Sequence, residues 1–249
     1  MDLMWIQAGF WGFLGGIALL LGALFGYYIQ ISKKIIASIM GFGAGVLIAA
    51  ACFALIEEAF QLGGYDSTLI GFTIGVLIFT GADIYLARRG AKHRKTSDKS
   101  RVASDYEESG SAIAVGAVLD GIPESVAIGL TIITGGLVSV ATVVAVFISN
   151  IPEGISSSVG MKKMGWSKKS IFSLWFIIAV ISGLSSLAGY SIFSKFPPDV
   201  NAATMALAAG ALLTMIADTM LPEAFAKTHE YTGLIVAFGF IVSFMLSMG

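Results

Sequence analysis

The feature that most constrains this chain is a series of apolar runs, each about 20 residues long, separated by short polar segments. Of the 249 residues, 56% are hydrophobic and 12% are charged, whereas an average soluble domain is roughly 25% charged. A run of ~20 apolar residues is the length that an α-helix needs to cross the hydrocarbon layer of a bilayer. Lipid offers no hydrogen-bond partner to the backbone, which a helix satisfies internally. We therefore expect an all-α, polytopic membrane protein.

Eight runs can be delimited, and we expect eight transmembrane helices within a single transmembrane domain over residues 1–249. Their approximate ranges are 5–30, 35–60, 67–88, 110–134, 137–161, 170–194, 201–226 and 231–248. The first run lacks the basic start of a signal peptide and is expected to be retained. The polar segment over residues 89–109 is expected to be a connector between the third and fourth spans. The single cysteine, Cys52, excludes an internal disulfide framework and a paired-cysteine metal site.

Lysine and arginine are distributed very unevenly between the two sides of this topology. Fourteen of the 15 lie at the connections after the first, third, fifth and seventh spans, and only Lys195 lies on the other side. Because basic residues favour the cytoplasmic side, we expect both termini outside and residues 89–109 in the cytoplasm. The expected location is the plasma (inner) membrane, with the lipid bilayer as a constant partner. Contact of the basic residues in 88–101 with anionic lipid is a secondary expectation.

Two pairs of segments resemble each other. Residues 43–60 align without gaps to residues 208–225, and GIPES at 121–125 resembles NIPEG at 150–154. In each pair the two spans run in opposite directions under the expected topology. Inverted repeats of this kind are typical of transporters whose binding site lies near the middle of the membrane, at the repeat interface. The pattern therefore predicts an inverted repeat of spans around a site near the middle of the membrane.

Three acidic residues fall near the middle of the fourth and fifth spans. Asp120 and Glu124 are four residues apart and share one helix face, and Glu153 lies in the next span. A charge at the centre of a bilayer costs from ~2.5 to well over 10 kcal/mol, depending on the method of measurement. No lysine, arginine or histidine occurs in the apolar body of any span. Protons or a bound cation must therefore neutralise these carboxylates.

Further oxygen ligands are available beside the carboxylates. Asn150 and Ser149 lie in the same span as Glu153, and Ser149 shares its face. Pro123 and Pro152 lack the N–H that would bond the carbonyl four residues earlier, and we expect them to break their helices and free those carbonyls. Oxygen ligands suit Mg, Ca or Mn, whereas imidazole and thiolate suit Zn and Cu. From the residues alone this is a divalent-cation or proton site of open identity.

Other acidic residues and the two histidines carry weaker predictions. Glu58 closes the second span and is either solvated or part of a transport path. Asp218 and Glu223 lie in the cytoplasmic half of the seventh span, where we favour a role in the path. His93 and His229 fall in cytoplasmic segments and are assigned to no site.

The fourth and fifth spans resemble those of the ZIP (Zrt-, Irt-like) family of metal transporters. That family carries His-Asn-x-Pro-Glu-Gly in its fourth span. When the prolines are matched, Asp120 falls at the histidine, Gly121 at the asparagine and Glu124 at the glutamate. The PEAF stretch in the seventh span adds support, and the resemblance in topology covers the whole chain. The resemblance implies an inverted-repeat arrangement of the eight spans as 3+2+3.

In the fifth span Ser149 falls at the family's histidine, Asn150 at its acidic residue and Glu153 at its bridging glutamate. The resemblance implies a two-metal site between these spans, import of zinc, iron or manganese, and an elevator-like movement of spans one, four, five and six against the others. Both signature histidines are missing, and span six has no acidic residue to complete a second position. We therefore expect one metal position, built on Asp120, Glu124 and Glu153 with Asn150.

The first hypothesis is thus a ZIP-like transporter of a divalent metal ion by alternating access, in which the metal is cargo and no cofactor is needed. A second is a membrane sensor or partner subunit that binds metal without moving it, and a third is a proton-coupled carrier of an organic solute. An enzyme is not expected, because no nucleophile–base pair or HExxH motif appears. No nucleic-acid partner is expected, and a homodimer is compatible with the sequence.

Overall fold

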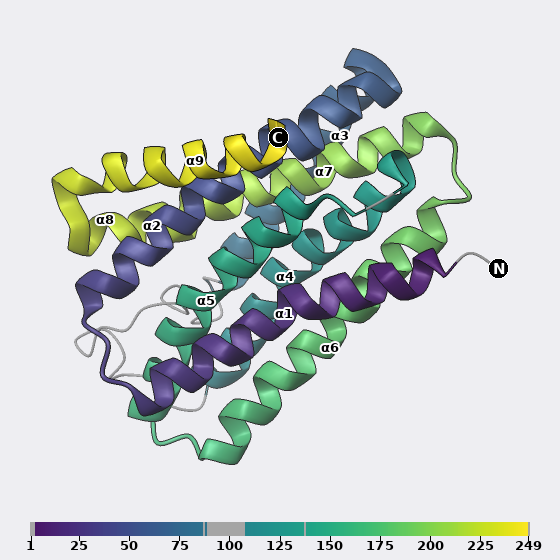
Figure 1. Cartoon of the computed structure of the whole chain (residues 1–249). Helices are drawn as coiled ribbons and strands as arrows, with labels where there is room; N and C mark the ends of the chain where they lie inside the picture. The colour runs from purple at the N-terminus through teal and green to yellow at the C-terminus, as the bar shows by residue number, and fades with distance from the viewer. Residues whose placement is uncertain (1–2, 87, 89–107, 137, 249) are drawn as a thin grey trace.

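The computed structural model describes residues 3–86, 88, 108–136 and 138–248. The described residues form α-helices joined by short turns, and they include the π-helical segments η1 and η4 and the 3₁₀ turn η5 (Figure 1). In chain order the elements are α1 (Met4–Tyr28), α2 (Lys33–Ala50), η1 (Ala51–Ile56), α3 (Glu57–Leu86), α4 (Glu108–Gly135), α5 (Val140–Lys163), α6 (Lys168–Phe193), α7 (Pro198–Met215), η4 (Ile216–Met220), α8 (Leu221–Thr228), η5 (His229–Tyr231) and α9 (Thr232–Met248). The all-α prediction is confirmed for these residues.

The predicted connector lies mostly outside the described residues. Its last two residues are an exception, because α4 begins at Glu108 and residues 108–109 are therefore helical. Several other helices begin where a serine caps the first turn. The side chains of Ser32, Ser139 and Ser167 accept hydrogen bonds from backbone N–H groups three residues later, which satisfies donors that a helix start otherwise leaves unpaired.

Among the described residues, six helical stretches are long and apolar enough to cross a membrane, and two of them are about twice the necessary length. Lys33–Tyr85 has 53 residues and Pro198–Leu246 has 49. Each contains a break in the helix. In the first, Gly64 has φ 69° and ψ −165°, a backbone conformation that glycine adopts without steric cost. In the second, His229 has φ 44° at the end of α8.

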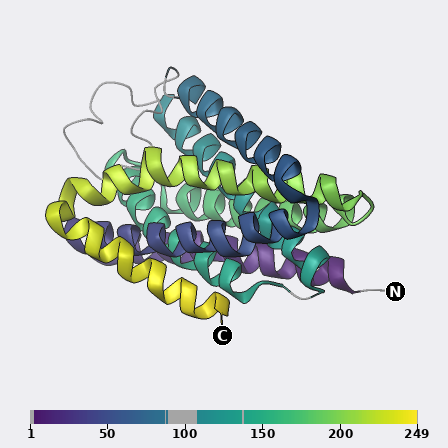
Figure 2. The ribbon, with the colours of Figure 1, turned by 90° about the horizontal axis from the view of Figure 1, so that it is seen from above.

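The helices pack in two groups (Figures 1 and 2). In the first group α1 packs against α5 and α6, and α4 packs against α6. In the second group α2 packs against α8 and α9, and α3 packs against α7. The groups meet mainly where α2 lies against α5 and where α4 lies against α7. The predicted site is carried by α4 and α5, and both of these helices therefore lie at the boundary between the groups.

Both repeated segments change from α-helix to π-helix at the same position. η1 begins at Ala51 and η4 begins at Ile216, and these residues are paired in the gapless alignment of 43–60 with 208–225. Figure 1 shows α2 and the α7–α8 rod running in opposite directions. Two segments of similar sequence thus share an uncommon local distortion, which often marks a functional site.

The same segments also share a close glycine contact. A Cβ added at Gly45 would lie 2.0 Å from the carbonyl oxygen of Val236 in α9, and one added at Gly210 would lie 2.3 Å from that of Phe72 in α3. Gly45 and Gly210 are again paired in the alignment. Small residues at such contacts let membrane helices approach closely, where van der Waals packing holds them.

Candidate metal site

Helix α4 supplies two buried carboxylates. Asp120 and Glu124 are each 2% exposed, and their spacing places them one turn apart on the same face of α4. Pro123 lies between them, inside a helix that runs without interruption to Gly135. The expectation that the prolines break their helices is therefore wrong for α4.

Helix α5 is also continuous through its proline, Pro152. Each proline still removes one backbone donor, so the carbonyls of Leu119 and Ile148 lose their usual helical partners. Membrane helices tolerate this loss because side chains, water and small local adjustments satisfy the freed groups. The backbone oxygens near the site therefore belong to helices that each lack one hydrogen bond at the proline but are not unwound.

Helix α5 supplies a carboxylate, an amide and a hydroxyl. Glu153 is 7% exposed, Asn150 4% and Ser149 2%. The Asn150 Nδ2 donates to the carbonyl oxygen of Gly15 in α1, at 3.0 Å. That bond identifies the nitrogen side of the amide and leaves Oδ1 as an acceptor on the other side. The Ser149 hydroxyl donates to the carbonyl of Val146 at 3.0 Å, and its oxygen can still accept or coordinate.

Close glycine contacts hold α5 in place on both sides. A Cβ added at Gly22 would lie 2.2 Å from the carbonyl oxygen of Ile151, and one added at Gly154 would lie 2.2 Å from that of Leu19. These contacts fix α5 against α1. On the other side, a Cβ at Gly43 in α2 would lie 3.0 Å from the Cα of Ser149. The predicted ligand Ser149 therefore lies directly at the contact between the two helix groups.

A hydrogen bond also crosses between the groups one turn beyond Glu153. The hydroxyl of Ser156, on α5, donates to Oε1 of Glu223, on α8, at 2.9 Å. Ser156 is completely buried and Glu223 is partly buried. Sequence reasoning assigned Glu223 to the path but missed Ser156. The signal was present, because Ser149, Glu153 and Ser156 are spaced i, i+4 and i+7 on one helix face.

The remaining predicted residues lie elsewhere. Glu58 is partly buried at the start of α3, and Asp218 is exposed within η4, in contrast to the buried Asp120. His229 is exposed and lies edge-on to the ring of Phe225, with centroids 5.9 Å apart. His93 falls outside the described residues.

In the part of the chain that the structure describes, no three histidine, cysteine, aspartate or glutamate side chains lie close enough together to hold a metal ion. The reason lies in the packing: α4 and α5 pack more extensively against α6 and α1 than against each other. A site that uses all three carboxylates therefore requires the side chains or helices to move, or ligands such as Asn150 and the backbone oxygens to take part.

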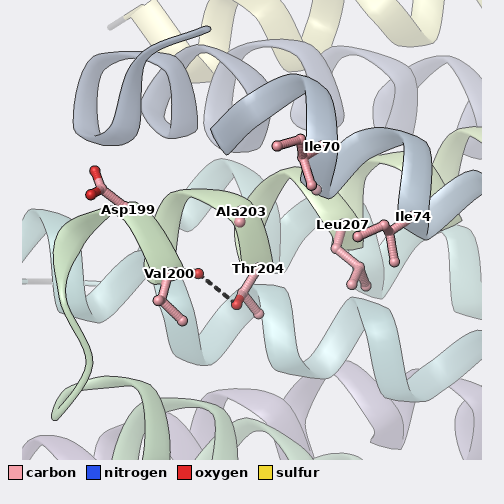
Figure 3. Close-up of a pocket in the computed structure, with 8 residues that line it drawn as sticks. Ile70, Ile74, Asp199, Val200, Ala203, Thr204 and Leu207 are labelled. Carbon is pink, nitrogen blue, oxygen red and sulfur yellow. Dashed lines mark hydrogen bonds between the residues drawn. The ribbon is translucent and has the colours of Figure 1, made fainter. Parts of the chain in front are cut away.

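A separate surface groove lies between α3 and α7 (Figure 3). Its volume is about 250 Å³, and it is lined mainly by apolar residues, among them Ile70, Ile74 and Leu207. Its polar members include Thr204, whose hydroxyl donates to the carbonyl of Val200 at 2.7 Å. None of the predicted ligands lines this groove, so it is not the cation site.

No protein-family model matches the sequence. A curated protein does: over 255 aligned residues, which cover 95% of this chain and 78% of the other, the chain is 27% identical to the zinc transporter ZIPB of Bordetella bronchiseptica. The likeness extends along nearly the whole length and is not confined to one motif. Together with the helices of membrane-spanning length, it identifies the chain as an integral membrane protein.

Proposed function

We propose that this protein is a ZIP-family transporter of divalent metal ions, with zinc, iron or manganese as cargo. The observation that carries the proposal is the set of three buried carboxylates, Asp120, Glu124 and Glu153, on two helices of a chain similar along 95% of its length to a zinc transporter. Carboxylates at this depth need a positive partner. Oxygen ligands of this kind suit hard or borderline divalent ions.

We propose eight membrane crossings, related by an inverted repeat. The breaks at Gly64 and His229 would divide the two longest apolar stretches into two crossings each. The paired π-helices at Ala51 and Ile216 support the repeat. The helix contacts also support the repeat. Helix α2 packs against α9 and α5, and its counterpart α7 packs against α3 and α4 in the corresponding way.

The proposed mechanism moves the first helix group against the second. The metal enters from outside and displaces protons from the carboxylates of α4 and α5. Once these protons leave, the like charges of Asp120, Glu124 and Glu153 oppose close approach, and a divalent ion between them reverses that balance. Cation binding therefore draws α4 and α5 together, and movement of the group exposes the site to the cytoplasm.

Glu223 and Ser156 lie on the cytoplasmic side of Glu153 in this account. A metal that leaves Glu153 meets the carboxylate of Glu223 next, which Ser156 holds at the boundary between the groups. Ser149 contributes a hydroxyl oxygen on the same face of α5. Glu58 and Asp218 are proposed as outer and inner points of the path, respectively, and the more exposed position of Asp218 makes it the weaker ligand.

Uptake in proteoliposomes tests the proposal. The purified protein is reconstituted, and entry of Zn²⁺, Fe²⁺ and Mn²⁺ is followed for the native sequence and for Glu124→Gln and Glu153→Gln. Glu230→Gln is the matched control, because Glu230 is exposed on η5, away from the membrane interior. We expect uptake to be lost in the two site variants and kept in the control. Unchanged uptake in both site variants would contradict the proposal. Metal binding without uptake in the native protein would instead support a sensor or partner subunit.

A further inference from the structure

An aromatic cluster lies at the end of α1, where it meets the turn between α5 and α6. The rings of Tyr27 and Phe172 have centroids 5.5 Å apart, and Tyr28 stacks on Phe172 at 6.2 Å with an interplanar angle of 17°. Tyr27 and Tyr28 also contact each other edge-on at 5.2 Å. Three rings from two helices thus form a single surface at the end of the first helix group.

Two lysines lie over these rings. The Lys162 Nζ is 4.5 Å from the centroid of Tyr27 and donates to the Tyr27 carbonyl oxygen. The Lys168 Nζ is 4.9 Å from the centroid of Tyr28. Attraction between a cation and an aromatic face contributes about 0.5–1 kcal/mol at exposed sites. These contacts favour the observed positions of the two ammonium groups over the other rotamers of an exposed lysine. We refer to Tyr27, Tyr28, Phe172, Lys162 and Lys168 as the lysine–tyrosine cluster.

The two sequence segments that carry this cluster have charge of one sign. The segments 21–40 and 154–180 contain six lysines and no aspartate or glutamate. Lys163 and Lys169 are neighbours of the two clustered lysines in the sequence, and Lys33 and Lys34 begin α2 directly after α1. Glu223 belongs to α8, whose main neighbour is α2, and Glu230 belongs to η5, which packs against α8 and α9. Within the segments 21–40 and 154–180, the lysine–tyrosine cluster is therefore surrounded in sequence by positive charge alone.

An apolar surface borders the charge. Phe25 on α1 is 47% exposed, Phe176 on α6 is 50% exposed, and Tyr28 is 57% exposed. Phe25 precedes the cluster by one turn on α1, and Phe176 follows Phe172 by one turn on α6. Tyrosine and lysine characteristically sit where hydrocarbon meets headgroups, with an apolar body and a polar tip. The surface thus offers cations to a phosphate and aromatic side chains to an acyl chain.

We propose that the lysine–tyrosine cluster is a binding surface for an anionic phospholipid. The phosphate lies against Lys162 and Lys168, and an acyl chain runs along Phe25 and Phe176. The lysine distribution places this end of the helices on the cytoplasmic side, where anionic lipids give the membrane a negative surface potential. The inference rests on the chain lying in a bilayer and needs no particular cargo, so its failure and the failure of metal transport are distinguishable.

The test is a titration of the full-length protein in neutral detergent with short-chain phosphatidylglycerol and short-chain phosphatidylcholine. Intrinsic tryptophan fluorescence reports binding, and the rise in Tm with lipid reports it independently. Lys168→Gln is the main variant, because Lys168 is exposed and its substitution leaves the bond between Lys162 and Tyr27 in place. Lys195→Gln is the matched control: Lys195 is the exposed lysine at the opposite end of α6.

We expect phosphatidylglycerol to bind more tightly than phosphatidylcholine. Lys168→Gln should weaken the anionic lipid about fivefold, the factor that corresponds to the ~1 kcal/mol that one lysine contributes near an anionic surface. Lys195→Gln should bind as the native protein does. Equal binding of the two lipids, or an unchanged Kd in Lys168→Gln, would overturn the proposal. Glycerophosphate competing as well as phosphatidylglycerol would overturn it too, since the surface would then be a site for free anions.

Discussion

The hydrogen bond between Ser156 and Glu223 gives a prediction whose size follows from the structure. It joins α5 in the first helix group to α8 in the second, at 2.9 Å. A hydrogen bond to a charged group contributes about 1.5–3 kcal/mol. If the groups move relative to each other during transport, this bond exists in only one arrangement. Ser156→Ala should then shift the equilibrium away from that arrangement by about 10- to 150-fold, since each 1.4 kcal/mol is a factor of ten.

The substitution is well suited to the question, because Ser156 is completely buried and alanine removes only the hydroxyl. Ser158→Ala is the matched control. Ser158 is equally buried on the same helix, but its hydroxyl donates within α5, to the carbonyl of Ile155 at 3.1 Å. Both variants should fold, and only Ser156→Ala should change the balance of arrangements.

The assay is a distance measurement by pulsed electron resonance, with Cys52 replaced by serine. Spin labels at Phe176 in the first group and Phe238 in the second occupy exposed positions, at 50% and 60% exposure. We expect two distance populations whose ratio changes in Ser156→Ala and not in Ser158→Ala. An identical ratio in both variants and in the native sequence would refute the view that this bond stabilises one arrangement.

Three further predictions concern packing and metal. Gly45→Ala should destabilise the protein by about 1–3 kcal/mol in thermal unfolding, as overpacking does, because the added Cβ would lie 2.0 Å from a carbonyl oxygen of α9. Gly81→Ala is the control: a Cβ there meets nothing within 4 Å, and the change should be neutral or mildly stabilising. Gly121→Asn should fold, since an added Cβ meets only the Ser182 hydroxyl at 3.6 Å. It should lower the Kd for Zn²⁺ or Mn²⁺ measured by calorimetry, because it adds an oxygen ligand beside Asp120. A raised Kd would count against a metal position there. Metal at 100 times its Kd should raise the stability of the native protein by about 2.7 kcal/mol, and a chelator should reverse the Tm shift.

The helices were predictable because an apolar run of this length in lipid must satisfy its backbone hydrogen bonds internally, which an α-helix does. The predicted range 110–134 differs from α4 by two residues at its start and one at its end, and 170–194 differs from α6 by two and one. The π-helical segments were not predictable, since a shift from α to π depends on packing that local sequence does not encode. Both nevertheless lie in the segments that the alignment of 43–60 with 208–225 pairs.

The burial of Asp120, Glu124 and Glu153 was predictable from their depth within the spans. Their mutual distances were not, because these depend on how α4 and α5 pack against α6 and α1. That packing is set by glycine contacts such as Gly22 with Ile151, which sequence alone does not pair. The breaking of helices by Pro123 and Pro152 was predicted wrongly, because a proline removes one hydrogen bond while the neighbouring helices hold the rest of the helix in place.

The most direct measurement of the central claim is the location of bound metal by anomalous X-ray scattering from crystals grown with Zn²⁺ or Mn²⁺. The account predicts one anomalous peak between α4 and α5, in contact with the carboxylates of Asp120, Glu124 and Glu153, and the loss of that peak in Glu124→Gln. The absence of any peak at these carboxylates at saturating metal, or a peak that persists unchanged in Glu124→Gln, would contradict it.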